Sequence, residues 1–283
     1  MSEELDMLTQ GGAVERGWLG LDEVIKVVLT GSAGRMGREV VRAISGEEGV
    51  RLVGAVDVSS EGQDAGLVAG IGEIGIPIRP DLSQVFAATS PDVMVDFTVA
   101  RSAEANIKSA IAHNVRFIVG TTGMTASAVE LIMNEAAHAG LGGAIVPNFA
   151  LGAVLMMRFA REASRYFPAC EIVELHHDGK VDFPSGTARA TAHEVASGRG
   201  DAVSMRGRDG GLRGVDIEGV PIHSIRLPGL VAHQEVIFGG PGQVLSIRHD
   251  SMGRDSFMPG VLLAVRKVME LDHVVLGLDS LLG

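Results

Sequence analysis

The sequence predicts an α/β protein in which a doubly wound parallel sheet is followed by a smaller α+β domain. Through the first half of the chain, short apolar runs alternate with longer segments of helical periodicity. This alternation is typical of a parallel sheet with helices on both faces. In the second half, glycine-rich loops and runs of alternating apolar and polar residues replace that order, which indicates mixed α and β structure.

Five apolar runs are the expected strands of the first half, and the segments between them supply helices. Each run is short and bounded by turn residues, as buried parallel strands are. The expected strands lie at residues 25–30, 52–56, 93–97, 116–119 and 144–146, and the expected helices are one that reaches residue 44 and two at 101–112 and 125–138.

The second half has fewer regular patterns. A helix is expected at residues 153–165, a strand at 170–177, and a second helix after Pro184 and Ser185. Three short runs then resemble a meander, at residues 222–226, 235–238 and 244–249. A helix at 257–269 and a last apolar run at 274–276 close the chain, and this terminal helix is expected to return to the first domain.

Composition narrows the class of protein. The 283 residues are 46% apolar, so a large core can form, and the net charge of −11 disfavours binding to nucleic acid or to anionic lipid. Cys170 is the single cysteine, which fits a reducing compartment. The acidic start argues against a secretory signal, and glycines with a Pro147-Asn148 break argue against a membrane span at the uncharged stretch 139–157. A cytoplasmic location is therefore expected.

The turn after the first expected strand is a variant of the dinucleotide fingerprint. Gly31, Gly34 and Gly37 allow a tight turn, a close approach of backbone to a pyrophosphate, and close packing of helix on strand. Asp57 follows the second expected strand, where an acid accepts hydrogen bonds from ribose hydroxyls. The pattern predicts a Rossmann-like sheet that binds a dinucleotide. The alternative is a tight strand–helix turn without a ligand.

The residues after Asp57 bear on the choice of coenzyme. Val58, Ser59 and Ser60 provide no positive charge for a 2′-phosphate, and Asp57 would repel one. We therefore expect NADH to be preferred over NADPH. Two further segments, 120–123 and 146–149, follow expected strands and fall on the edge of the sheet where ligands bind, although each could also be an ordinary turn.

Residues 174–187 concentrate the groups that could carry chemistry. His176, His177 and Lys180 can place positive charge beside an anion, and a histidine is readily poised to deliver a proton near neutral pH. Residues 185–187 open a helix, where unpaired N–H groups favour a carboxylate or phosphate.

Other interpretations of these residues remain open. One of the two adjacent histidines could be a structural hydrogen-bonding group, because neighbouring side chains on a strand point to opposite faces. A zinc site lacks a third ligand at a recognisable spacing, so no metal is expected, and no strand–elbow motif frames Ser185 as a nucleophile. The remaining histidines have no motif around them and are interpreted as surface or core residues: His113, His138, His193, His223, His233, His249 and His273.

Taken together, the motifs resemble the 4-hydroxy-tetrahydrodipicolinate reductase (dihydrodipicolinate reductase) family. The resemblance rests on Gly31-Ser-Ala-Gly-Arg-Met-Gly37, Asp96-Phe97-Thr98, Gly120-Thr121-Thr122-Gly123, Asn148-Phe149 and, above all, Glu174-Leu-His-His-Asp-Gly-Lys-Val-Asp-Phe-Pro-Ser-Gly-Thr187. It implies a dinucleotide-binding domain at 24–148 completed by 257–283, and a substrate-binding and oligomerisation domain at 149–256, while the weakly patterned residues 1–23 are expected to be an N-terminal extension outside the resemblance. It also implies a homotetramer.

The same resemblance implies roles for particular residues. His176 would be the proton donor with Lys180 as its catalytic partner, and the substrate would contact His177, Ser185, Gly186 and Thr187. The cofactor would lie against Gly31, Ser32, Ala33, Gly34, Arg35, Met36, Asp57, Gly120, Thr121, Thr122, Val146, Pro147, Asn148 and Phe149. The implied reaction is the NAD(P)H-dependent reduction of a small cyclic dicarboxylate in the diaminopimelate route to lysine. The family often has a basic residue after the ribose acid, where this chain has Val58.

Two alternatives stand beside this function. Another amino-acid-pathway dehydrogenase that uses NAD(P) would share the first half but not the His-His-x-x-Lys segment. A non-catalytic protein that senses NAD would keep the glycine turn and bind the nucleotide without turning it over.

Overall fold

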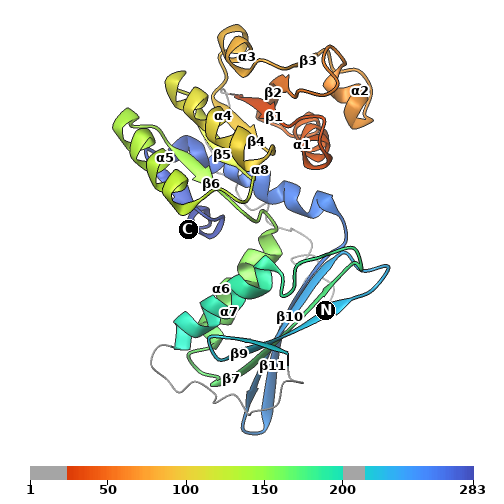
Figure 1. Cartoon of the computed structure of the whole chain (residues 1–283), viewed down its shortest axis with the longest axis vertical. Helices are drawn as coiled ribbons and strands as arrows, with labels where there is room; N and C mark the ends of the chain where they lie inside the picture. The colour runs from red at the N-terminus through yellow and green to blue at the C-terminus, as the bar shows by residue number, and fades with distance from the viewer. Residues whose placement is uncertain (1–23, 200–213) are drawn as a thin grey trace, which may run out of the picture.

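The computed structural model describes residues 24–199 and 214–283, which form two sheets, each covered by helices (Figure 1). The N-terminal extension expected at residues 1–23 lies outside the described residues. The fold class predicted from the sequence, a Rossmann-like parallel sheet with a second α+β unit, is confirmed.

The first sheet has seven strands, and every strand pair in it is parallel. Its order is β12-β6-β5-β4-β1-β2-β3. The strands are β1 (Ile25–Thr30), β2 (Val50–Val56), β3 (Ile78–Arg79), β4 (Val93–Asp96), β5 (Arg116–Val119), β6 (Gly143–Ile145) and β12 (Val274–Leu276). Because the order reverses between β1 and β4, the crevice at the carboxyl ends of these two strands is where such a sheet binds ligands.

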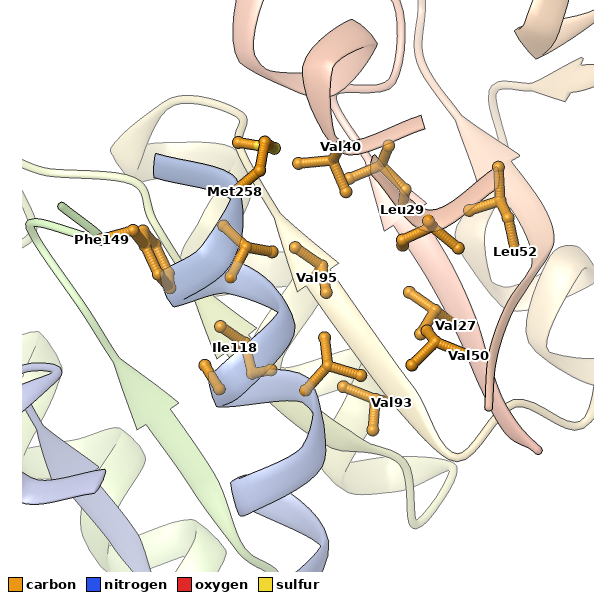
Figure 2. Packing of buried hydrophobic residues seen from close by; sticks show 14 of the residues in the cluster. Val27, Leu29, Val40, Val50, Leu52, Val93, Val95, Ile118, Phe149 and Met258 are labelled. Atoms are coloured by element: carbon orange, nitrogen blue, oxygen red, sulfur yellow. The ribbon is translucent and has the colours of Figure 1, made fainter. Parts of the chain in front are cut away.

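Helices cover both faces of this sheet because its strands are apolar on both sides. Val27 and Leu29 of β1 belong to one core cluster, and Val28 between them belongs to the other. The helices are α1 (Arg35–Ser45), α2 (Ala65–Ala69), α3 (Leu82–Thr89), α4 (Ala100–Ala112), α5 (Ala126–Ala139) and α8 (Met258–Lys267). Figure 2 shows α8 lying against the first sheet, with Met258 near Val95 and Val40.

Several elements near the sheet edge were not predicted. The helices α2 and α3 and the strand β3 are too short for a periodic pattern to identify them. The carboxylate of Asp64 organises this region by accepting hydrogen bonds from the backbone N–H groups of Gly66, Leu67, Ile74 and Ile76. Half of these contacts join residues ten or more positions apart, so no local pattern marks them.

The second sheet has five strands in the order β11-β10-β7-β9-β8. They are β7 (Ala169–His176), β8 (Val215–Ile217), β9 (Val220–Arg226), β10 (Ala232–Gly240) and β11 (Gln243–Ser251), and the helices α6 (Leu151–Ala163) and α7 (Gly186–Arg199) belong to the same unit. A third core cluster lies between these helices and the sheet and includes Met156, Ile172 and Phe238.

The expected meander of three strands is wrong. β10 and β11 form a hairpin, but β9 does not pair with β10, because β7 lies between them. β7 pairs antiparallel with β10 and parallel with β9. The chain between β7 and β9 passes through α7, and a crossover of this kind is what parallel pairing requires.

The end of the chain returns to the first sheet. The predicted helix at 257–269 is a succession of a 3₁₀ turn η2 (Arg254–Phe257), α8, and a second 3₁₀ turn η3 (Val268–Glu270). β12 then pairs with β6, and η4 (Asp279–Leu281) follows. Over residues 24–199 and 214–283, none of the helices has the length and apolar character needed to span a membrane.

Candidate active site

The turn after β1 and the first turn of α1 can pack together only with glycine at two positions. Gly31 has a φ of +76°, and a Cβ there would lie 2.5 Å from the carbonyl oxygen of Phe97. A Cβ on Gly37 would overlap the carbonyl oxygen of Gly31. The first turn of α1 therefore packs directly on the loop, which brings its N-terminus to the carboxyl edge of the sheet.

The N-terminus of α1 is suited to an anionic group. Gly34 caps the helix without a side chain, and the first turn carries no acidic residue. The N–H groups of this turn and the helix dipole therefore favour a phosphate at this position. Ser32 holds the loop against the end of β2, because its hydroxyl donates to the Val56 carbonyl (3.3 Å).

Asp57 lies at the end of β2 and faces this loop. Its Oδ2 accepts from the backbone N–H of Ala33 (3.0 Å), and its Oδ1 accepts from the N–H and hydroxyl of Ser59 (2.9 and 2.7 Å). The structure thus brings the predicted ribose acid next to the predicted pyrophosphate loop.

Asp96 joins the strand ends around this crevice. Its carboxylate is fully buried at the end of β4. It accepts from the hydroxyls of Thr30 (2.7 Å), Thr98 (2.8 Å) and Thr121 (2.8 Å), from the Asn106 amide (2.7 Å) and from the Thr98 N–H (3.0 Å). The end of β1 and the segments after β4 and β5 are therefore held by one carboxylate.

Replacing Asp96 with asparagine should destabilise the protein. An amide has one oxygen in place of two, and its NH₂ group would face the donors Thr30 and Asn106 or Thr98 and Thr121. Leaving buried donors unpaired costs about 1–3 kcal/mol each, so we expect the urea midpoint to fall clearly. Asp81→Asn is the control, because Asp81 is an exposed helix cap and asparagine caps a helix equally well. Equal midpoints for the two variants would contradict this role of Asp96.

A cavity of about 350 Å³ opens at this crevice. Its lining includes the predicted residues Met36, Gly120, Thr121 and Thr122, together with residues 97–100. A Cβ on Gly120 would overlap the Phe97 ring, whose centre lies 5.5 Å from that of Phe149. Val146 is buried after β6, while Arg35 is exposed at the start of α1. These residues fit a nicotinamide dinucleotide.

A second cavity of about 250 Å³ lies where the two sheets are joined. Its lining brings together residues from the end of β7, the start of α7, β10, β11 and the segment after β6. The polar members are Asn148, His176, Ser185, Thr187, His233, Gln234, His249 and Ser251, and Pro147 and Phe257 are among the apolar ones.

Ser185 and Thr187 present the start of α7 to this cavity. The Ser185 hydroxyl accepts from the backbone N–H of Ala188 (3.1 Å) and so caps the helix. A hydroxyl can accept and donate at once, so Ser185 can still donate to a ligand. The Asn148 amide donates to the Thr187 hydroxyl (3.4 Å), which links the segment after β6 to this helix. Gly186 forms the first residue of α7 but does not line the cavity.

His176 is held by a buried ion pair. Its Nδ1 is hydrogen-bonded to Glu174, which is fully buried and accepts two bonds from the Arg226 guanidinium (2.8 and 3.0 Å). Burial lowers the pKa of His176 below its usual value, although Glu174 acts in the opposite direction. Burial acts to raise the pKa of Glu174, but hydrogen bonds from Arg226 and Ser224 outweigh it and lower that pKa.

His177 and Lys180, also predicted from the sequence, lie in the loop after His176 and do not line the cavity. The Lys180 ammonium is paired with Asp182 (2.7 Å), and the Lys180 backbone N–H donates to the His177 carbonyl (3.2 Å). The structure therefore brings together His176, Ser185 and Thr187, and places His177 and Lys180 beside this group.

His233 and His249, interpreted from the sequence as surface or core residues, both line the second cavity, and His233 is buried. His233 is paired with Asp250 (2.6 Å) and accepts at Nε2 from the Val231 N–H (3.2 Å). Burial lowers the pKa of His249, and its ring lies so close to Gly152 that a Cβ there would overlap it. No local motif marks either histidine, since only strand pairing brings them to the site.

Comparison with known proteins identifies the family. The sequence model described as "Dihydrodipicolinate reductase, N-terminus" matches residues 25–149, and the one described as "Dihydrodipicolinate reductase, C-terminus" matches residues 152–282. This chain belongs to the dihydrodipicolinate reductase family. The resemblance predicted from the sequence motifs is therefore confirmed, and with it the assignment to a family of oxidoreductases.

Relatives of the dihydrodipicolinate reductase family match nearly the whole chain. The 4-hydroxy-tetrahydrodipicolinate reductase of Moorella thermoacetica is 48% identical over 261 residues, covering 91% of this chain and 98% of that protein. The protein of the same name from Listeria innocua is 46% identical over 263 residues, covering 91% and 100%.

One solved structure agrees with this membership, and another shares the fold. A structure described as dipicolinate-bound dihydrodipicolinate reductase from Paenisporosarcina sp. TG-14 has a TM-score of 0.82 and 39% identity, covering 92% of this chain and 100% of that one. An amine dehydrogenase from Mycobacterium smegmatis has a TM-score of 0.64 at 14% identity, covering 92% and 96% of the two chains, and is similar in fold alone.

Proposed function

We propose that this chain reduces 4-hydroxy-tetrahydrodipicolinate to tetrahydrodipicolinate with NADH or NADPH, in the diaminopimelate route to lysine. The reaction consumes one reduced nicotinamide and one proton and releases the oxidised nicotinamide and water. The observation that carries the proposal is the second cavity, where His176 and the start of α7 meet Pro147 and Asn148, which follow β6 of the first sheet. Curated relatives named for this activity and family membership support it.

The groups around the second cavity suit a small cyclic dicarboxylate. The hydroxyls of Ser185 and Thr187 and the first N–H groups of α7 would bind one carboxylate, as a helix N-terminus favours an anion. His177, Gly186 and the ammonium of Lys180 would complete that contact from the adjoining loop. Local positive charge attracts a small anion even when the whole chain is acidic.

The first cavity and the glycine turn would hold the nucleotide. The N-terminus of α1 would bind its pyrophosphate, Asp57 its ribose, and residues 120–122 and 146–149 the nicotinamide side. When bound, reduced nicotinamide supplies the hydride. His176, with Lys180 as its partner, would deliver the balancing proton, and nearby cationic groups would stabilise negative charge that develops on the ring.

NADH should be used in preference to NADPH. The two oxygens of Asp57 accept hydrogen bonds from the N–H groups of Ala33 and Ser59. Val58 beside it is 91% exposed and offers no positive charge to a 2′-phosphate. We expect a higher KM for NADPH than for NADH in initial-rate assays. Val58→Arg should lower the KM for NADPH and leave that for NADH within about 2-fold, since one charge-assisted hydrogen bond contributes about 1.5–3 kcal/mol. A wild-type KM lower for NADPH than for NADH would contradict this preference.

One assay tests the function against its alternatives. The substrate is made in situ by the preceding synthase, and oxidation of NADH is followed by its absorbance. Oxidation that depends on both the synthase and this protein supports the proposal. Oxidation only with another amino-acid-pathway substrate would favour a different dehydrogenase, and binding of NADH without turnover would favour a sensor of NAD.

The proposal also assigns a function to each of the two domains. Residues 24–148 with 257–283 would bind the dinucleotide, and residues 149–256 would bind substrate and mediate assembly into a homotetramer. The single cysteine fits a cytoplasmic location. Light scattering on the purified full chain gives the mass of the assembly, and a monomeric mass would exclude the tetramer.

A further inference from the structure

The buried charges behind His176 have a consequence for its chemistry. We infer that Glu174 and Arg226 are positioning residues, which fix His176 so that its Nδ1–H donates to Glu174 and its Nε2 points toward the substrate cavity. This inference rests on the proposed function, in which His176 delivers the proton. Glu174 and Arg226 do not line the cavity, so they would act through His176 and not by contact with substrate.

The hydrogen bonds define which nitrogen is available. Glu174 is a carboxylate with lowered pKa, so it accepts, and Nδ1 of His176 must be the donor. Nδ1 is therefore occupied on the side of the sheet core, and Nε2 is the nitrogen left for the cavity. A ring that kept its proton on Nε2 would instead place two acceptors against each other.

Arg226 connects this histidine with the loop of Lys180. Its guanidinium binds both oxygens of Glu174, and its NH2 group also donates to the Asp182 carbonyl (2.8 Å). Asp182 in turn holds the Lys180 ammonium. One arginine of β9 thus orients the two residues expected to share the proton transfer, although they come from a strand end and a loop.

The charges around His176 set the direction of each expected change. Glu174 on β7 raises the pKa of His176, while Arg226 on β9 and Lys180 in the following loop lower it. His233 on β10 and His249 on β11 line the same cavity, and Asp182 faces Lys180. Removing the charge of Glu174 should lower the pKa of His176, and removing the charge of Arg226 should raise it.

A matched control lies on the opposite face of the same two strands. Glu171 of β7 pairs with His223 of β9 (2.8 Å), so it is a second Glu–His pair on the strands that carry Glu174 and Arg226, and it is partly exposed. Glu171 and Glu174 are three positions apart on a strand, and their side chains therefore point to opposite faces.

The test uses the full chain labelled with ¹⁵N-histidine, in the wild type and in Glu174→Gln, Arg226→Gln and Glu171→Gln. His176 is assigned by the loss of its signals in His176→Gln. We expect neutral His176 to carry its proton on Nδ1 in the wild type. Its pKa should fall in Glu174→Gln, rise in Arg226→Gln and stay unchanged in Glu171→Gln.

Kinetics give the second measurement. If protonated His176 is the donor, kcat is lost as pH rises through its pKa. This loss should move to lower pH in Glu174→Gln and to higher pH in Arg226→Gln. At neutral pH, Glu174→Gln should lower kcat by about 10-fold to 100-fold, which is less than the roughly 10²–10⁴-fold that a positioned proton donor contributes, because His176 itself remains in place. The KM for NADH should change little.

The outcomes separate this inference from the proposed function. Failure of the wild type to reduce the substrate would overturn the function. A wild type that turns over, with its His176 proton on Nε2, would overturn the inference alone. Shifts of the same sign in both variants would also overturn it, because they would indicate a structural disturbance. The tautomer is read in the wild type, so the test holds even if a variant fails to fold.

Discussion

Replacing Lys180 with alanine is expected to lower kcat by about 10²–10⁴-fold, the range that a positioned proton-transfer group contributes. Lys180 is the cation of the loop after His176, and its ammonium is held at 2.7 Å from Asp182. It would share the proton transfer with His176 and bind the anionic substrate. Lys180 is not among the described residues that line the cavity beside the glycine turn, so the affinity for NADH should not change.

The matched control for this variant is Lys267→Ala. Lys267 is also paired with an acid, Glu270 (3.1 Å), and its side chain is 24% exposed, compared with 22% for Lys180. Steady-state kinetics give kcat, and fluorescence titration gives the affinity for NADH. Near-normal turnover of Lys180→Ala would exclude Lys180 from the chemistry.

The second large effect is expected for Gly37→Ala. The added Cβ would overlap the Gly31 carbonyl oxygen, which is backbone and cannot move aside like a flexible side chain. Overpacking of this kind costs about 1–3 kcal/mol or more, and it would also displace the first turn of α1 from the nucleotide loop. We expect a lower melting temperature and a loss of NADH affinity of about 10-fold or more, since about 1.4 kcal/mol corresponds to a factor of ten.

Gly46→Ala provides the comparison on the same helix. Gly46 caps the end of α1 with a φ of −102°, and a Cβ there would meet no atom within 4 Å. Calorimetry and titration with NADH should therefore give values close to those of the wild type. If both variants bound NADH like the wild type, the close contact at Gly37 would have no role in the nucleotide site.

Most of the first sheet could be predicted because its strands, except β3, are local patterns. Each of these strands is a short apolar run between turn residues, and the glycine turn marks where β1 passes into α1. The second sheet depends on pairing between distant segments. β7 lies between β9 and β10, and this order follows from packing on α6 and α7 and not from any run of residues.

The candidate site divides in the same way. His176, Ser185 and Thr187 belong to one contiguous segment, so the sequence could indicate them together. His233 and His249 reach the same cavity only through the register of β10 and β11, in which His233 faces Asp250 and Gln234 faces His249. The role of Glu174 was also not predicted, because it depends on Arg226, which lies 52 positions along the chain.

The second sheet is inserted in the chain between β6 and α8, so two covalent crossings join it to the first. Pro147 and Asn148 mark one crossing and Phe257 the other, and all three line the second cavity. Two crossings of this kind can act as a hinge between the two halves. Because the crossing residues themselves line the cavity, a rotation of one half against the other would change the shape of this cavity.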